Sequence, residues 1–238
     1  MRKVLITGGA SGLGYALAQA YQTRGCQITV LDCQPPPPEL KCHYLPLNLA
    51  NLSPEQMPVM ETCFDLVICN AGISLSGKFT ELDFAAEKNV MEINCLGHMQ
   101  LLKGLLQQNA IQPGGQIAFV CSATAFLPFP IALAYAASKG ALDGFAQALE
   151  AYLIPQKIAI SRIYPGPMQT PHTRYYPVLG SRKGRDPTQS VPAIMRGLAR
   201  RRRKILPDPV SRWLWLGSFV FPGLLARKAY QTYRDFLN

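Results

Sequence analysis

Cysteine is missing after residue 121 of this chain, and the seven cysteines present follow no metal or disulfide pattern. All of them lie at or before Cys121, without a CxxC pair or a His/Cys spacing typical of a metal site. Several fall within apolar, strand-like runs. We therefore expect reduced thiols in the core, no bound metal and a cytoplasmic location, because free thiols persist in reducing compartments.

Long apolar segments of the kind that target or span membranes are also missing. Residues 1–6 enter a strand pattern at once and lack the apolar core of a secretory signal, so we expect none. Near the C-terminus, residues 213–226 form an uncharged, aromatic-rich stretch of 14 residues. A helix needs about 20 apolar residues to cross a bilayer, so this stretch is too short to span one.

Acidic residues are scarce in the last quarter of the chain. Residues 1–180 carry 11 basic and 11 acidic side chains, whereas residues 181–238 carry 13 basic and 3 acidic ones. The whole formal net charge of +10 therefore lies at the C-terminal end. A neutral body with a basic end suits an anionic membrane surface, an acidic protein or an anionic substrate, and we expect no nucleic-acid partner.

The C-terminal end combines this charge with apolar residues. A helix predicted over residues 187–203 leads into the basic run 200–204, whose cations suit the negative end of a helix dipole. Residues 205–238 are interpreted as an apolar and basic extension of the same domain. This extension either packs over a substrate cleft or at a subunit interface, or residues 196–227 contact a membrane peripherally.

At its start the chain has a strand, a glycine-rich turn and a helix in immediate succession. Residues 4–6 are an apolar strand, residues 7–14 read Thr-Gly-Gly-Ala-Ser-Gly-Leu-Gly, and residues 15–23 favour a helix. Glycines let the backbone approach a ligand, and the helix N-terminus offers free N–H groups to a pyrophosphate. The arrangement predicts a dinucleotide site, with an ordinary tight turn as the alternative.

Asp32 ends the second predicted strand, residues 28–31, and lies 18 residues after Gly14. An acidic side chain there is placed to hold a ribose 2′-hydroxyl and would repel a 2′-phosphate. No residue from 7 to 14 is basic, and neither is Cys33. We therefore favour NAD over NADP as the cofactor; the alternative for Asp32 is a solvated residue at a strand end.

Further strands and helices alternate along the chain. Four prolines at residues 35–38 predict a stiff loop where a helical crossover would usually stand. Strands are expected near residues 42–45 and at 64–69, 117–121 and 158–163, and helices at 80–109 and 134–153. The alternation predicts an α/β, Rossmann-like doubly wound parallel β-sheet with helices on both faces, in one domain over residues 1–238. Five strand ends should then converge on one cleft, at Gly8, Asp32, Asn70, Ser122 and Pro165.

Tyr135 and Lys139 are four residues apart on a predicted helix, so their side chains share one face. A nearby ammonium group favours the phenolate, which makes such a pair a proton-transfer device. The alternative is an ordinary helix face, because the spacing is common. Asn94, in the middle of the helix expected at 80–109, is interpreted by default as a solvated or capped side chain.

In their order and spacing, these motifs resemble those of the short-chain dehydrogenase/reductase family over residues 2–205. Residues 7–14 look like the family's cofactor turn, and Asn70-Ala71-Gly72 looks like its sheet-stabilising motif. Tyr135 and Lys139 look like its catalytic motif. The resemblance implies cofactor contacts by Gly8, Ser11, Gly12, Leu13, Gly14, Asp32, Asn48, Leu49, Asn70, Ala71, Gly72, Tyr135, Lys139, Pro165, Gly166, Met168 and Thr170.

The resemblance also assigns catalytic roles. Ser122 stands 13 residues before Tyr135, where the family has its catalytic serine, and Asn94 matches the catalytic asparagine. By this analogy Tyr135 is the general acid or base, Ser122 orients the substrate oxygen, Lys139 lowers the tyrosine pKa and binds the nicotinamide ribose, and Asn94 holds a water. The implied reaction is hydride transfer between a nicotinamide cofactor and a carbonyl or secondary alcohol.

Three features depart from the family pattern. Asn48 replaces an aspartate at the adenine, Met168 replaces a branched aliphatic residue near the nicotinamide, and the crossover after Asp32 is shortened. An amide can replace the carboxylate, while the other two changes alter pocket shape and expose the adenine edge.

Substrate contacts are expected from two stretches. Residues 123–131 include Phe126, Pro128 and Phe129, which favours a hydrophobic small molecule, and residues 172–185 include His172, Tyr175 and Tyr176. His172 is interpreted as a surface loop residue rather than a catalytic one. By analogy with the family, the helices at 80–109 and 134–153 would form a homodimer or homotetramer interface. The competing interpretation is a cofactor-binding sensor or scaffold whose basic end binds a membrane or an acidic partner.

Overall fold

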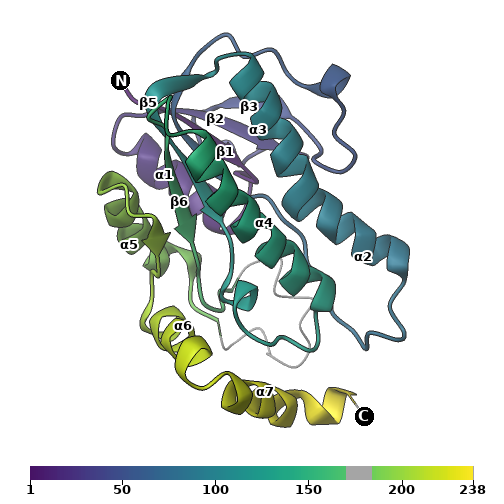
Figure 1. Cartoon of the computed structure of the whole chain (residues 1–238). Helices are drawn as coiled ribbons and strands as arrows, with labels where there is room; N and C mark the ends of the chain where they lie inside the picture. The colour runs from purple at the N-terminus through teal and green to yellow at the C-terminus, as the bar shows by residue number, and fades with distance from the viewer. Residues whose placement is uncertain (170–183, 238) are drawn as a thin grey trace.

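The computed structural model describes residues 1–169 and 184–237 and places a parallel sheet between two layers of helices (Figure 1). Within these residues seven strands pair in the order β3-β2-β1-β4-β5-β6-β7, and every pairing is parallel. The predicted Rossmann-like, doubly wound sheet is confirmed. The strands are β1 (Lys3–Thr7), β2 (Gln27–Asp32), β3 (His43–Pro46), β4 (Phe64–Cys69), β5 (Ile111–Val120), β6 (Ala159–Ile163) and β7 (Lys204–Ile205).

Both faces of the central strands are buried, which explains their continuous apolar runs. On one face Val4 and Ile6 of β1 belong to a cluster with α1 (Gly12–Gln22) and α5 (Pro187–Ala199). On the other face Leu5 packs in a cluster with α3 (Gly97–Gln107) and α4 (Leu133–Tyr152). Side chains alternate across a strand, so one short run of apolar residues serves both layers.

The connection from β2 to β3 is a loop without a helix, as its prolines predict. Leu40 within this loop is buried against the α1 face of the sheet, which anchors the connection. Before β4 lies the 3-10 turn η1 (Pro54–Gln56), closed by a capping box between Ser53 and Gln56.

The single helix predicted over residues 80–109 is wrong in its detail. α2 (Phe84–Met91) begins only after Asp83, whose carboxylate accepts a hydrogen bond from the Ala85 N–H at 3.2 Å. Helical structure then continues through η2 (Glu92–Leu96), which has π-type hydrogen bonding, into α3. Apolar periodicity cannot reveal such a π segment, because it adds a residue to one turn without interrupting the helix.

Two further boundaries differ from the prediction. β5 starts at Ile111 rather than Ile117, because Pro113 and its glycine neighbours stay in the strand across a register shift against β4. α5 ends at Ala199 rather than Arg203, since Arg201 adopts φ +49° and turns the chain into β7. The basic run is therefore a turn at the sheet edge and not the last turn of a helix.

Two helices close the chain, α6 (Pro209–Val220) and α7 (Pro222–Leu237). Asp208 caps α6 by accepting a hydrogen bond from the Ser211 N–H at 2.8 Å. Figure 1 shows the two helices running along the edge of the molecule below α4 and α5. Of the helices in the described ranges, none combines the length and the hydropathy needed to cross a membrane.

Candidate active site

The carboxyl ends of the strands surround one cavity of about 670 Å³. All five strand ends expected to converge line it, from Gly8 after β1 to Pro165 after β6. Among the predicted site residues, Gly14 and Asn94 lie outside the lining, and Thr170 falls outside the described residues, as do His172, Tyr175 and Tyr176. The predicted residues that line it are Gly8, Ser11, Gly12, Leu13, Asp32, Asn48, Leu49, Asn70, Ala71, Gly72, Ser122, Tyr135, Lys139, Pro165, Gly166 and Met168.

The glycine turn fits between β1 and α1 only because side chains are absent. Gly8 and Gly12 have φ of +65° and +55°, a region that L-residues rarely adopt. A Cβ atom at Gly14 would stand 2.0 Å from the Gly8 carbonyl oxygen. Gly14 therefore acts beneath the cavity, by letting α1 approach the turn. The N-terminus of α1 then points its free N–H groups at the cavity, which suits a pyrophosphate.

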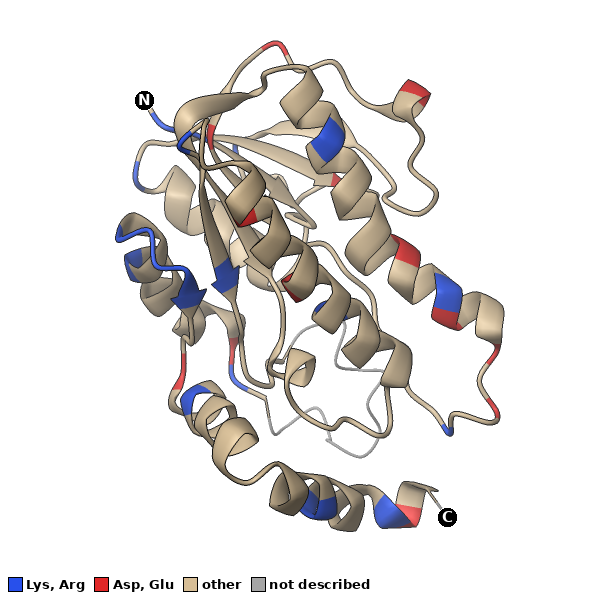
Figure 2. Ribbon diagram, viewed as in Figure 1, with Lys and Arg blue, Asp and Glu red and all other residues tan. Residues whose placement is uncertain are grey.

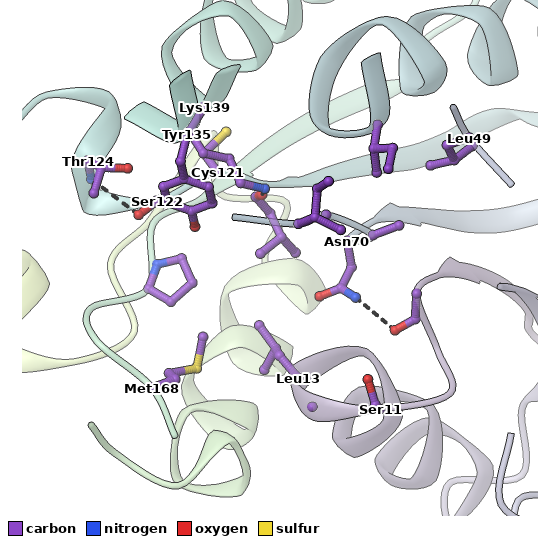
Figure 3. Close-up of a pocket in the computed structure, with 18 of the residues that line it drawn as sticks. Ser11, Leu13, Leu49, Asn70, Cys121, Ser122, Thr124, Tyr135, Lys139 and Met168 are labelled. Carbon is purple, nitrogen blue, oxygen red and sulfur yellow. Dashed lines mark hydrogen bonds between the residues drawn. The ribbon is translucent and has the colours of Figure 1, made fainter. Parts of the chain in front are cut away.

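The motif after β4 holds this turn in place. The Asn70 side-chain amide donates hydrogen bonds to the carbonyl oxygens of Thr7 and Gly8, both at 3.0 Å (Figure 3). The Thr7 hydroxyl accepts the N–H groups of Asn70 and Ala71 at 2.9 and 3.0 Å. The ends of β1 and β4 are thus tied by four polar contacts, which fixes the floor of the cavity.

Asp32 lines the cavity at the end of β2. Its carboxylate accepts hydrogen bonds from the N–H groups of Ala10 at 2.9 Å and Gln34 at 3.0 Å. These contacts connect the strand end to the glycine turn and orient the carboxylate. Among the described lining residues, Lys139 is the only lysine or arginine, so this end of the cavity presents no cation to a 2′-phosphate.

Ser122, Tyr135 and Lys139 form the opposite wall (Figure 3). Ser122 follows β5, and its hydroxyl accepts the Thr124 N–H at 3.2 Å and is hydrogen-bonded to Tyr135. The Lys139 ammonium lies 5.8 Å from the centroid of the Tyr135 ring and donates to the Val120 carbonyl oxygen at 2.9 Å. A phenol, a hydroxyl and a buried amine therefore meet at one side of the cavity.

Burial affects the pKa values of both Tyr135 and Lys139. Burial raises the pKa of Tyr135 to about 12, and the hydrogen bond with Ser122 only partly offsets it. Burial also lowers the pKa of Lys139. Burial therefore shifts the pKa values of the two groups in opposite directions. At neutral pH Tyr135 is a protonated phenol, the form that donates a proton.

Asn94 is fully buried, which overturns its interpretation as a solvated side chain. Its amide oxygen accepts the Ile73 N–H at 2.8 Å, and its amide nitrogen donates to the Ile73 carbonyl and the Ser138 hydroxyl, both at 2.9 Å. A Cβ atom at Gly72 would lie 3.0 Å from that oxygen and 3.4 Å from the Lys139 ammonium. Asn94 therefore supports the cavity wall from behind, close to Lys139.

His98 is a residue that the sequence analysis missed. Its Nε2 lies 3.0 Å from the Thr7 hydroxyl, and its Nδ1 lies 3.2 Å from the Asn94 carbonyl oxygen. Burial lowers the pKa of His98 to about 3, so the ring is neutral, with Nδ1 donating to the carbonyl and Nε2 accepting from Thr7. The ring joins the glycine-turn strand to the Asn94 segment. The signal in the sequence was its position four residues after Asn94, on the same helix face.

Asp208 was also missed, whereas Thr124 lies in the stretch 123–131 where substrate contacts were expected. Asp208 is buried, accepts the Gly166 N–H at 3.0 Å and also caps α6, so it connects the Pro165-Gly166 segment to the C-terminal helices. Thr124 lines the cavity with a buried hydroxyl that has no hydrogen-bond partner among the described residues. A ligand oxygen or nitrogen would satisfy it.

Apolar side chains close the far end of the cavity. Leu127, Pro128 and Phe129 line it from the segment after β5, as expected, while Phe126 instead packs on Tyr164 at a ring distance of 5.5 Å. Leu214 of α6 and Tyr233 of α7 also line it. The Tyr233 ring meets that of Phe129 edge-on at 5.8 Å.

The chain matches the model of the short chain dehydrogenase family over residues 2–177, and it belongs to this family. A dehydrogenase/reductase SDR family protein 7-like protein of Drosophila melanogaster is 32% identical over 190 residues, which cover 70% of this chain and 57% of that protein. Human 17-beta-hydroxysteroid dehydrogenase type 1 is 28% identical over 188 residues, covering 70% and 57%. The chain spans 57% to 61% of the first three curated relatives it matches.

Solved structures support the same fold. A short chain dehydrogenase from Burkholderia cenocepacia in complex with NADP superposes with a TM-score of 0.79 at 20% identity, covering 96% of this chain and 99% of that one. At this identity the likeness shows a shared fold.

Proposed function

We propose that this chain transfers a hydride between NAD and the carbonyl or secondary alcohol of a hydrophobic small molecule. The observation that carries the proposal is the meeting of Ser122, Tyr135 and Lys139 on one wall of the cavity that the glycine turn also lines. A hydroxyl, a phenol and an amine that can each donate or accept a proton meet here beside the proposed dinucleotide site. Folding alone does not require this combination.

The proposed roles follow from protonation and position. Tyr135, a protonated phenol at neutral pH, donates its proton to the oxygen of a carbonyl substrate, and Ser122 holds that oxygen by a hydrogen bond. Lys139 binds the nicotinamide ribose, and Asn94 fixes the cavity wall beside Lys139. The nicotinamide supplies the hydride in reduction and accepts it in oxidation.

NAD is proposed over NADP on electrostatic grounds. The glycine turn fits the proposed cofactor, since Gly8 lines the cavity and a Cβ atom there would stand 2.7 Å from the Ala71 Cα. The oriented Asp32 carboxylate is placed to accept a ribose 2′-hydroxyl and repels a 2′-phosphate. The NADP held by the Burkholderia structure argues for the other cofactor, so both belong in the assay.

A lipophilic substrate is proposed from the apolar end of the cavity. Leu127, Phe129, Leu214 and Tyr233 offer hydrocarbon and aromatic surface, with Thr124 available for a polar group of the substrate. The relative named as a 17-beta-hydroxysteroid dehydrogenase supports this substrate class.

The assembly and setting are further proposals. The groove between α3 and α4 is lined by apolar residues such as Met99, Phe145 and Leu153, and Tyr152 beside it is 70% exposed, which supports a homodimer or homotetramer formed through these helices. We propose one catalytic domain over residues 1–238, with residues 205–238 as its extension. All seven cysteines are free thiols, which supports a reducing, cytoplasmic setting.

The test is turnover of a panel of hydrophobic ketones and secondary alcohols with NADH, NADPH and their oxidised forms. Tyr135→Phe should lower turnover by roughly 10² to 10⁴ and leave cofactor binding intact, because only the acid-base group is removed. Tyr230→Phe, at an exposed tyrosine of α7, should behave as the unmodified chain does. Equal turnover by Tyr135→Phe, or cofactor binding without turnover in the unmodified chain, would reject the enzyme proposal and favour a cofactor-binding sensor.

A further inference from the structure

The outer face of the C-terminal helices gathers exposed apolar side chains. Of the sixteen large apolar residues that are exposed in the described ranges, eight lie between residues 210 and 230. Trp213, Phe219 and Leu224 are 73%, 67% and 62% exposed. A contiguous patch of this kind marks an interaction site, because soluble monomers rarely leave one uncovered. We define the C-terminal apolar face as Val210, Trp213, Leu216, Phe219, Val220, Phe221 and Leu224.

This face is separate from the side of the helices that packs on the body. On α6 the buried Ser211 and the half-buried Leu214 and Trp215 form the inner side, and Leu214 lines the active-site cavity. On α7 the inner side includes Tyr233, which is buried in a cluster with Ile131 and Ala132. The inner side of both helices therefore packs on the body of the protein, whereas their apolar outer side has no packing partner elsewhere among the described residues.

The charges around the face are almost all positive. α6 and α7 carry Arg212, Arg227, Lys228 and Arg234, whereas Asp235 is their one acidic residue and is paired with Arg234 at 3.3 Å. In the ribbon of Figure 2, basic residues (blue) lie at the start of α6 and along α7, apart from the basic turn after α5. That turn is engaged elsewhere, since Arg203 pairs with Glu150 at 2.6 Å.

We propose that the C-terminal apolar face docks on an anionic lipid surface. Aromatic and aliphatic side chains enter the acyl boundary of a bilayer, and adjacent arginines and lysines bind its phosphate and carboxylate groups. A second copy of the chain fits less well, because two such faces would bring Arg212, Arg227 and Lys228 against their own counterparts. Complementary charge therefore selects the lipid.

Docking there places the active-site cavity next to the bilayer. The inner sides of the same helices line the cavity through Leu214 and Tyr233, so a lipophilic substrate would reach it from the membrane side. This use rests on the proposed function, whereas the docking itself does not.

The experiment is vesicle co-sedimentation of the full chain, with vesicles of phosphatidylcholine alone and of phosphatidylcholine with phosphatidylserine. The chain should bind the anionic vesicles more tightly. The double substitution Trp213→Ser with Phe219→Ser should weaken binding to the anionic vesicles at least tenfold. The double substitution Arg227→Gln with Lys228→Gln should lower the affinity for the same vesicles roughly tenfold, mainly by reducing the preference for phosphatidylserine. Phe84→Ser, which alters a 77% exposed residue of α2, should change nothing.

Other outcomes overturn the proposal. These are no binding to either vesicle, binding that the apolar double substitution leaves unchanged, or a dimer in light scattering that this substitution dissociates without any vesicle binding. Tyr135→Phe serves as the separate arm, because it should bind vesicles like the unmodified chain whether or not the proposed reaction is correct.

Discussion

Two regions of the molecule differ in how their side chains are buried and hydrogen-bonded. One is the carboxyl end of the sheet, which carries the proposed active site, and the other is the pair of C-terminal helices. At the carboxyl end of the sheet, polar groups are buried and nearly all have partners: Asn94 makes three side-chain hydrogen bonds, and Thr7 joins Asn70 to His98. Along α6 and α7, large apolar groups such as Trp213 and Phe219 are exposed instead. The first region is specified by hydrogen-bond geometry and tolerates little change. The second is held by a few inner contacts, which leaves its outer face free to serve binding.

The largest effect on stability and cofactor binding should come from adding a side chain between α1 and the glycine turn. Gly14→Ala would place a Cβ atom 2.0 Å from the Gly8 carbonyl oxygen and 2.5 Å from the Asn70 amide, and neither backbone nor tied amide can retreat. We expect the free energy of unfolding to fall by roughly 1–3 kcal/mol or more, together with loss of cofactor binding. Chemical denaturation and cofactor titration would measure both.

Gly144→Ala is the matched control, since the structure has nothing within 4 Å of that Cβ position on α4. It should stabilise the chain by roughly 0.5–1 kcal/mol, because alanine favours a helix. A well-folded Gly14→Ala chain with normal cofactor affinity would contradict the close approach of α1 to the turn.

A smaller effect is expected at His98. Its folded pKa is lowered to about 3, whereas an unfolded histidine has about 6.5, so between these values the unfolded chain binds the extra proton. The neutral His98 ring thus makes its full contribution to the stability of the folded chain above about pH 6.5, and this contribution is lost as pH falls towards 3. His98→Gln should lower stability at neutral pH by roughly 1–3 kcal/mol and flatten this acid dependence. Urea unfolding across this pH range would measure it.

His43→Gln, at an exposed position of β3, should keep the acid dependence of the unmodified chain. Parallel stability curves for the unmodified chain and His98→Gln would show that the buried ring does not carry the proton linkage.

The smallest effect should lie in the C-terminal helices. Tyr233→Ala removes a ring that lines the cavity and contacts Phe129, so KM for a lipophilic substrate should rise by roughly tenfold while cofactor affinity stays unchanged. Steady-state kinetics would separate KM from kcat. Tyr230→Ala, 55% exposed on the same helix, should leave KM alone. A change in cofactor affinity with Tyr233→Ala would mean that the two regions are coupled.

Much of the architecture was predictable because it depends on local patterns. Apolar runs at β1, β2 and β4 and the glycine spacing at residues 7–14 predicted strands, turn and helix, and parallel order predicted that their ends converge. Element boundaries were less predictable. Arg201 ends α5 through its backbone conformation, and the π segment around Asn94 leaves apolar periodicity unchanged.

For the proposed site, the sequence by itself predicted which residues carry chemistry: Tyr135 and Lys139 from their spacing on a helix, and Ser122 from the family resemblance. Only the tertiary structure decided their protonation. Burial from several distant segments raises the pKa of Tyr135 and lowers that of Lys139, and desolvation cannot be read from neighbours in the chain. Likewise, only folding brings His98 to Thr7, 91 positions away in the sequence, and Tyr233 to Phe129, 104 positions away. Such distant contacts depend on how the layers of the fold pack.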